Sequence, residues 1–88
     1  MRKIWHDEAW EECSYLINYD KKLYKRLYEL IKDIERHPFE GIGKPEPLKY
    51  GLSGWWSRRI DDSERLVYRI TGDAIEILSC RYHPQLTL

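Results

Sequence analysis

The dipeptide Gly72-Asp73 constrains the fold of this chain most strongly, because it separates two stretches in which apolar and polar residues alternate. A two-residue loop of this composition between alternating stretches predicts a tight β-hairpin with a fixed register. The predicted pairs are Ile70 with Ile75, Tyr68 with Ile77, Arg69 with Glu76 and Arg65 with Cys80. Tyr82 is then diagonal to Arg65, so the end of the chain is expected beside the start of the preceding strand.

Two helices are predicted in the first half of the chain, where apolar residues recur at helical rather than strand spacing. The first should begin at Asp7, whose side chain can accept from free helix N–H groups, and end near Asn18. Asp20 is a capping candidate for the second helix, which has the stronger apolar stripe. Pro38 cannot continue it, so this helix should end at residue 36 or 37.

The remaining segments complete an α+β fold. Residues 2–5 fit a first strand, and residues 55–60 alternate like a strand that precedes the hairpin. Residues 38–47 hold three prolines and two glycines, which predicts a structured loop in place of a helix or a central strand. The expected architecture is an N-terminal strand followed by a two-helix hairpin that packs on one face of an antiparallel sheet.

The 88 residues suffice for one domain, 1–88, of which 84–88 are expected to form a C-terminal tail. No second domain for a cofactor fits in this length, and no cofactor is expected. Cys13 and Cys80 lie in apolar periodic segments without metal-ligand spacing, so we expect buried thiols and neither a disulfide nor a zinc site. No stretch resembles a signal peptide or a membrane span, which leaves the cytoplasm as the expected location and no membrane partner.

The charges cancel over the whole chain but are unevenly distributed. Residues 21–60 hold ten basic and five acidic groups, a local excess of +5, whereas residues 1–20 and 61–88 are acidic at −3 and −2. A positive middle segment is suited to a phosphate backbone. An ordinary solvated helix face explains the helical lysines equally well.

Three residues fit the cleavage of RNA through its own 2′-hydroxyl, which needs a base, a cation at the phosphate and an acid for the leaving oxygen, but no metal. Glu46 is the candidate base, and prolines on both sides restrict its backbone. Arg65 offers a planar guanidinium that can grip phosphate oxygens. His83 offers an imidazole for proton transfer near neutral pH. Each also has a plainer interpretation, as a surface carboxylate, as a strand arginine paired with Asp61, Asp62 or Glu64, or as an idle exposed histidine.

Further basic and aromatic residues can support RNA binding. Lys49 and Arg59 add positive charge, and the rings of Tyr50, Trp55 and Tyr82 can stack on unpaired bases. Aromatic residues at strand spacing are more often part of the core, which we expect of Trp56 and Tyr68. His6 and His37 stand at element boundaries and are interpreted as idle.

Four ordered motifs resemble the YoeB/Txe toxin family of the RelE/ParE superfamily, and the likeness spans nearly the whole chain. These are Lys44-Pro45-Glu46-Pro47-Leu48-Lys49, Leu52-Ser53-Gly54-Trp55-Trp56-Ser57-Arg58-Arg59-Ile60, Arg65-Leu66-Val67-Tyr68 and Cys80-Arg81-Tyr82-His83. Ile4-Trp5 and Pro38-Phe39-Glu40-Gly41 also fit its pattern. The resemblance implies a type II toxin, an endoribonuclease that cleaves messenger RNA in the ribosomal A site and stops translation.

The resemblance also implies roles and partners. Glu46 would be the base, His83 the acid and Arg65 the group that stabilises the phosphate, with Lys49 and Arg59 in support. A cognate antitoxin would neutralise the toxin, and operator DNA would be bound only through the antitoxin complex. Such toxins are often seen as dimers, so a homodimer is a possible assembly. One departure is that Pro84 and four more residues follow His83, where the family pattern ends His-Tyr; Tyr82 is a candidate to replace the missing hydroxyl.

Two other functions remain open from the sequence. One is a non-enzymatic module that blocks the ribosome or another target, for which Glu46→Ala and His83→Gln would keep full toxicity. The other is a co-repressor formed with the antitoxin, which can coexist with RNA cleavage.

Overall fold

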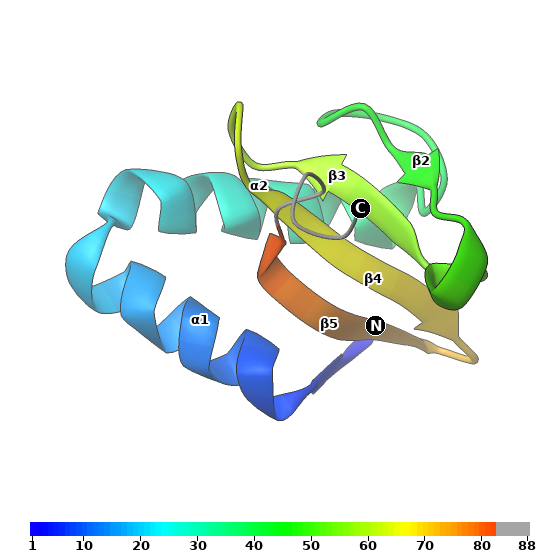
Figure 1. Ribbon diagram of the computed structural model, residues 1–88, viewed down its shortest axis with the longest axis horizontal. Coiled ribbons are helices and arrows are strands. Elements are labelled where there is room, and N and C mark those ends of the chain that lie inside the picture. Colours follow the sequence, from blue (N-terminus) through cyan, green and yellow to red (C-terminus); the bar gives the residue numbers. More distant parts are fainter. Residues whose placement is uncertain (83–88) are drawn as a thin grey trace.

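The computed structural model describes residues 1–82, which form two helices and a five-stranded sheet (Figure 1). The elements follow in the order β1 (Arg2–Trp5), α1 (Asp7–Tyr19), α2 (Lys21–Arg36), β2 (Glu46–Pro47), a 3₁₀ turn (Tyr50–Leu52), β3 (Trp56–Arg59), β4 (Arg65–Thr71) and β5 (Ala74–Tyr82).

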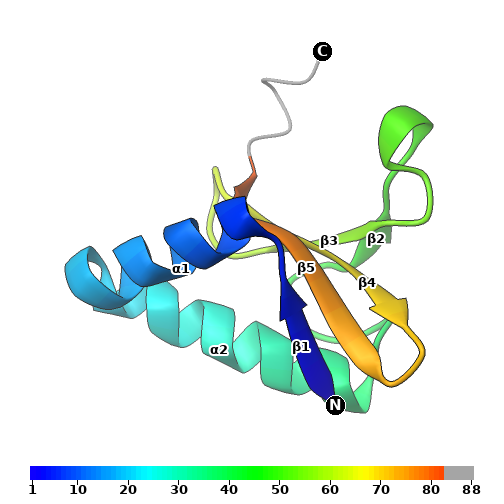
Figure 2. The ribbon, with the colours of Figure 1, turned by 90° about the horizontal axis from the view of Figure 1, so that it is seen from below.

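The sheet has the strand order β1-β5-β4-β3-β2, and both helices lie on one of its faces (Figure 2). Neighbours from β2 to β5 are antiparallel, whereas β1 runs parallel to β5, with Arg2 opposite Ala74 and Trp5 opposite Ile77. The α+β architecture with helices on one face is therefore confirmed, and the parallel first strand makes the sheet a mixed one. Within residues 1–82, no helix is long and apolar enough to cross a membrane.

The helix boundaries agree closely with the periodicity. The Asp20 carboxylate accepts a hydrogen bond from the Leu23 backbone N–H at 3.1 Å, so the predicted cap of α2 is confirmed. His6 occupies the N-cap position of α1, and Asp7 is the first helical residue. The acidic group of Asp7 thus lies in the first turn, where it complements the helix dipole.

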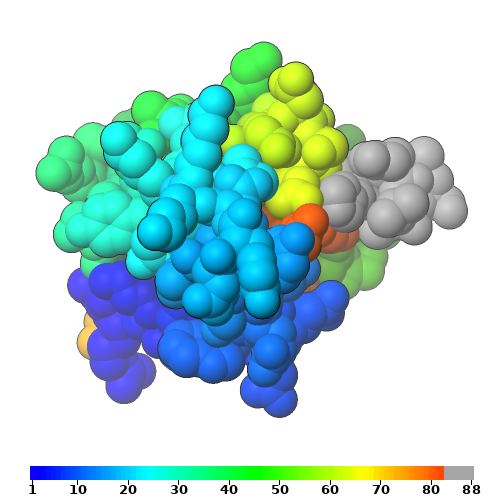
Figure 3. Space-filling view, turned by 90° about the vertical axis from the view of Figure 1, so that its left-hand side faces the viewer, coloured from blue at the N-terminus to red at the C-terminus, as the bar shows by residue number. Residues whose placement is uncertain are grey.

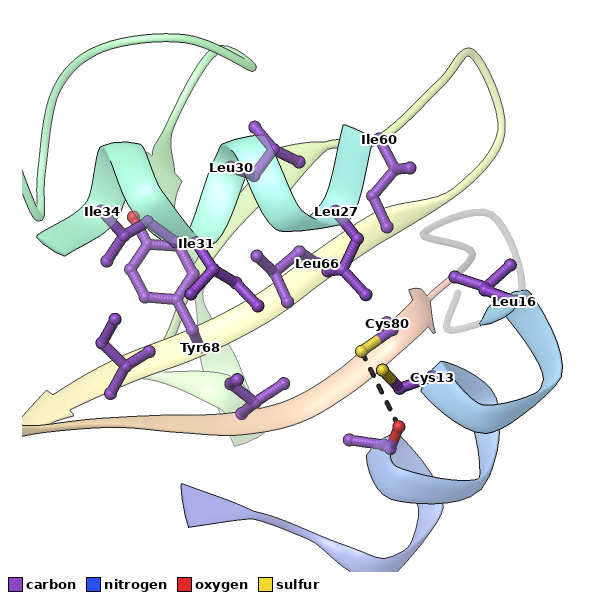
Figure 4. Close-up of a cluster of buried hydrophobic side chains, with 13 residues drawn as sticks. Cys13, Leu16, Leu27, Leu30, Ile31, Ile34, Ile60, Leu66, Tyr68 and Cys80 are labelled. Carbon is purple, nitrogen blue, oxygen red and sulfur yellow. Dashed lines mark hydrogen bonds between the residues drawn. The ribbon is translucent and has the colours of Figure 1, made fainter. Parts of the chain in front are cut away.

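The core lies between the helices and the sheet and includes Leu27, Leu30 and Ile34 of α2 (Figure 4). Tyr68 is fully buried among them, as predicted, and Trp56 is half-buried against the same cluster. The two cysteines, both in the described part of the chain, are free and buried, and the Cys80 thiol lies 3.8 Å from the Ala9 carbonyl oxygen.

The predicted hairpin register is confirmed from Thr71 opposite Ala74 to Tyr68 opposite Ile77. Beyond Tyr68 it is wrong, because two register shifts add residues to β5. Arg65 consequently lies opposite Tyr82 and not opposite Cys80. The first shift lets Cys80 face the core, where its exposed fraction is 0%, while Arg65 stays on the open face of the sheet.

Candidate active site

Arg65 and Glu46 meet on the open face of the sheet, the face that the helices leave uncovered. The Arg65 Nη1–H group donates to Glu46 Oε1 and also lies 3.4 Å from Ser57 Oγ. Arg65 begins β4, Glu46 begins β2, and Ser57 of β3 lies opposite Glu46 in the strand pairing. The Arg65 side chain is 18% exposed and the Glu46 side chain 54%, so solvent and a ligand can reach the carboxylate.

The local sequence explains how Glu46 reaches this position. Pro45 and Pro47 restrict the backbone on both sides of it, and Glu46–Pro47 forms the two-residue edge strand β2. Proline is tolerated there because the outer side of an edge strand needs no ladder hydrogen bond. The predicted structured loop thus ends in a short edge strand, a conformation that aims the carboxylate across β3.

Asp61 and Glu64, two of the acidic residues near Arg65 in sequence, have other partners. Asp61 Oδ1 accepts from the backbone N–H groups of Ser63 and Glu64 at 2.9 and 2.7 Å, so it organises the turn before β4. Glu64 is buried and pairs with Arg81, whose Nε and Nη2 both approach Glu64 Oε1 within 3.1 Å. Figure 3 shows the segment around this turn against the end of β5. Arg65 therefore pairs across the sheet with Glu46.

Two further cations extend the positive charge around Arg65. Arg59 is exposed and lies directly opposite Arg65 in the pairing of β3 with β4. Lys49 is exposed at the start of the 3₁₀ turn that follows β2. Like charges on neighbouring strands repel one another, so this arrangement favours a bound anion.

Of the two remaining candidates, the structure describes Tyr82 but not His83. Tyr82 is half-buried on β5, directly opposite Arg65. His83, the candidate acid, and the following Pro84 lie outside the described residues. The structure therefore describes five of the six predicted site residues, four of them on β2, β3, β4 and β5 and Lys49 at the start of the 3₁₀ turn.

The aromatic residues proposed for base stacking separate into two kinds. Tyr50 is 93% exposed and has a positive φ of 59°, which presents its ring to solvent. Trp55 is buried, because the Arg69 guanidinium stacks over it at 4.4 Å and the His6 ring meets it edge-on at 5.8 Å. Among these rings, Tyr50 is open to a base and Trp55 is already covered.

His6 is not idle, which corrects the interpretation made from the sequence. Its Nε2 lies 2.6 Å from Glu76 Oε2, and the other oxygen of Glu76 accepts from Arg69 Nε at 2.7 Å. Arg69 and then His6 hold the pKa of Glu76 down at about 2. The sequence does not reveal this contact, because His6 and Glu76 meet only through the long-range pairing of β1 with β5.

Arg58 is the main residue that sequence reasoning missed. It alternates with Trp56 and Ile60 on the helix-facing side of β3, and its side chain is fully buried. The sequence did hold a signal for it, namely a charged residue at a position of the alternating strand where a core residue is expected. Within residues 1–82, no group of three or more His, Cys, Asp or Glu side chains is arranged to hold a metal ion.

Comparison with known proteins shows which protein family the sequence matches. Residues 5–84 match the family described as the YoeB-like toxin of bacterial type II toxin–antitoxin systems. The chain is 54% identical to Toxin YoeB of Escherichia coli (strain K12) over 83 residues, which cover 94% of this chain and 99% of that protein.

Two solved structures from Staphylococcus aureus are similar as well. A YoeB dimer superposes with a TM-score of 0.90 at 44% identity, covering 94% of this chain and 97% of the other. The toxin of a heterotetrameric YoeB–YefM toxin–antitoxin complex gives a TM-score of 0.89 with the same identity and coverage.

Proposed function

The chain belongs to the YoeB-like toxins of bacterial type II toxin–antitoxin systems, and on that premise we propose that it is an endoribonuclease that cleaves messenger RNA in the ribosomal A site. The observation that carries the proposal is the contact between Glu46 and Arg65 on the open face of the sheet. A carboxylate and a guanidinium held together supply two of the three groups that the reaction requires.

In the proposed reaction Glu46 removes the proton from the 2′-hydroxyl of the RNA. The 2′-oxygen then forms a bond to the adjacent phosphorus, the bond from phosphorus to the 5′-oxygen breaks, and His83 donates a proton to that oxygen. Arg65 binds the non-bridging phosphate oxygens, whose negative charge increases in the transition state. The products are a 2′,3′-cyclic phosphate and a free 5′-hydroxyl.

The contact between Glu46 and Arg65 gives substrate binding a second role. Without RNA, each side chain neutralises the other. An RNA phosphate that takes the Arg65 guanidinium releases the Glu46 carboxylate to act as a base. Arg59, opposite Arg65 on β3, and Lys49 would attract the neighbouring phosphates, and Tyr82, opposite Arg65 on β5, would contact the nucleotide at the cleaved bond.

The proposed partners follow from the family. The YoeB–YefM complex and the YoeB dimer of Staphylococcus aureus support a cognate antitoxin and a homodimer for this chain. Operator DNA would be contacted through the antitoxin complex. The chain would act in the cytoplasm, where it meets translating ribosomes.

The test is primer extension on messenger RNA in a purified translation system. Wild-type chain should produce cuts inside the ribosome-bound reading frame, and the fragments should carry 2′,3′-cyclic phosphates. Glu46→Gln should slow the cuts by about 10²–10⁴-fold, the contribution typical of a general base, whereas Glu11→Gln, an exposed residue of α1 on the helix side of the sheet, should leave them unchanged. Intact message with folded wild-type chain on translating ribosomes contradicts the proposal. Undiminished growth inhibition by Glu46→Gln would instead favour the non-enzymatic alternative.

A further inference from the structure

Arg58 lies on the opposite side of β3 from the candidate active site, and five hydrogen bonds leave its guanidinium. Its Nε donates to Tyr68 Oη at 3.2 Å. Its Nη1 donates to Asp33 Oδ2 at 2.6 Å and to the Ile42 carbonyl oxygen at 3.1 Å. Its Nη2 donates to the carbonyl oxygens of His37 and Glu40 at 2.5 and 2.8 Å. Every N–H of this buried side chain thus has an acceptor within residues 1–82.

These bonds converge on the loop between α2 and β2. The residues bound to Arg58 bind the loop as well, because Tyr68 Oη donates to the Pro38 carbonyl oxygen at 2.6 Å and Asp33 Oδ2 accepts from the Ile42 N–H at 3.1 Å. The hydrogen bond from Arg58 also lowers the pKa of Asp33, which keeps the aspartate charged. The loop is therefore held along most of its length by one side chain and its two partners.

The held loop leads directly to Glu46. The backbone N–H of Arg59 donates to the Gly43 carbonyl oxygen at 2.7 Å, and Glu46 follows three residues later, opposite Ser57. Ser57 and Arg58 are neighbours on β3 whose side chains point to opposite faces of the sheet. Arg58 binds the loop on the helix side of the sheet. Ser57 lies on the open face, where its Oγ contacts Arg65.

Stability alone is a weak reason to bury an arginine. An apolar side chain of similar volume at a buried ion pair is often neutral or more stable. What an apolar residue cannot do is bind three loop carbonyl groups at once. The geometry thus serves to fix the path of the loop.

We propose that Arg58, together with Asp33 and Tyr68, is a positioning residue that sets the place of the Glu46 carboxylate relative to Arg65. The proposal rests on the proposed function, in which Glu46 is the base. Arg58 itself touches neither the RNA nor the reacting atoms. It acts through the loop.

The test compares Arg58→Lys and Tyr68→Phe with wild type in steady-state cleavage of ribosome-bound message. A displacement of about 1 Å in a catalytic group lowers rates on the order of 10²-fold, so kcat should fall about 10- to 100-fold in Arg58→Lys and less in Tyr68→Phe. KM should stay near the wild-type value, because Lys49 and Arg59 are untouched. Ile75→Val, a fully buried position on β5, is the control for loss of core packing and should keep kcat.

A double mutant separates positioning from general destabilisation. If Arg58 acts through Glu46, Arg58→Lys should lower the residual rate of Glu46→Gln no further. Amide hydrogen exchange should also accelerate at Ile42 in Arg58→Lys while the core amides of β4 stay protected. Additive losses in the double mutant, or an unchanged kcat in both single variants, overturn the proposal.

The two proposals fail in distinguishable ways. If Glu46→Gln cleaves as fast as wild type, the proposed function is wrong whatever Arg58 does. If Glu46→Gln is slowed as expected and the Arg58 and Tyr68 variants cleave normally, only the positioning role is wrong. Should Arg58→Lys fail to fold by circular dichroism, Tyr68→Phe, which keeps the buried ring and removes one hydroxyl, carries the test.

Discussion

Glu46 accepts a hydrogen bond from Arg65 across β3, although 19 positions separate the two residues in the chain. Neither lies near the other in sequence, and the strand between them contributes Ser57 to the same contact. The pair is thus a product of the sheet order β2-β3-β4. A change at either residue alters the charge that the other one faces.

Removing the guanidinium of Arg65 should slow cleavage without unfolding the chain. Arg65→Ala should lower the single-turnover rate on ribosome-bound message by about 10²–10³-fold, the loss typical of one preorganised donor to a charged transition state. The rate of Arg65→Lys should lie between those of wild type and Arg65→Ala, because lysine keeps the charge but lacks the planar guanidinium. Urea unfolding of both variants is the control and should change little, since the Glu46 carboxylate that Arg65 contacts is exposed to solvent. Wild-type rates in Arg65→Ala would contradict its role at the phosphate.

Stability should fall in acid through Glu76. Arg69 and His6 lower its pKa from 4.5 to about 2, so the stabilisation is complete above pH 4.5 and is lost as the pH falls toward 2. Glu76→Gln should therefore lower the free energy of unfolding at pH 7 and flatten its decline between pH 4.5 and 2. Part of the decline should remain in this variant, because Lys3 and the N-terminus also lower the pKa of Glu35 to about 2. Urea titrations at several pH values measure the free energy of unfolding. If the pH dependence of Glu76→Gln runs parallel to that of wild type, the contacts of Glu76 with Arg69 and His6 contribute nothing to it.

Gly43 should tolerate no side chain. Its φ is +80°, and a Cβ there would lie 2.7 Å from Leu30 Cδ2 and 3.2 Å from the Arg59 carbonyl oxygen. Gly43→Ala should destabilise the fold by about 2–4 kcal/mol from backbone strain and overpacking together. Gly51→Ala is the matched control, because within residues 1–82 a Cβ at Gly51 meets no heavy atom within 4 Å, and it should shift stability by about 0.5 kcal/mol or less. Equal midpoints in urea for the two variants would refute the clash.

The two thiols should react in a fixed order. Cys13 is 7% exposed and lines a groove of about 360 Å³ between β1 and the helices, whereas Cys80 is fully buried beneath α1. Burial raises the pKa of both thiols, so both should react slowly with a disulfide reagent in the native state. Cys13 should be modified first and Cys80 only on global unfolding. Labelling of Cys13→Ser and Cys80→Ser variants assigns the phases, and rapid modification of Cys80 without denaturant would show that β5 opens locally.

The parts of the fold that local chemistry determines were predictable from the sequence. Gly72 and Asp73 set the pairing of Ile70 with Ile75, and Asp20 capped α2 as expected, because each effect acts over a few residues. The shifts in β5 were not predictable, since they depend on how Cys80 packs against α1. Tertiary contacts of this kind produce no periodic pattern of apolar residues in the sequence.

The candidate site divides in the same way. Residue types and spacing suggested Glu46 and Arg65, but nothing local could show that the carboxylate crosses β3 to reach the guanidinium. That arrangement depends on a buried Arg58 that binds a loop 16 to 21 residues earlier in the chain, a distance over which sequence patterns carry little information.

The parallel pairing of β1 with β5 has a consequence for biosynthesis. Arg2–Trp5 is synthesised before every other described strand, yet its only neighbour among them is Ala74–Ile77 of the last one. At roughly 5–20 residues per second, the nascent chain must extend for several seconds before that neighbour exists. The sheet therefore cannot close until β5 has been synthesised, several seconds after β1.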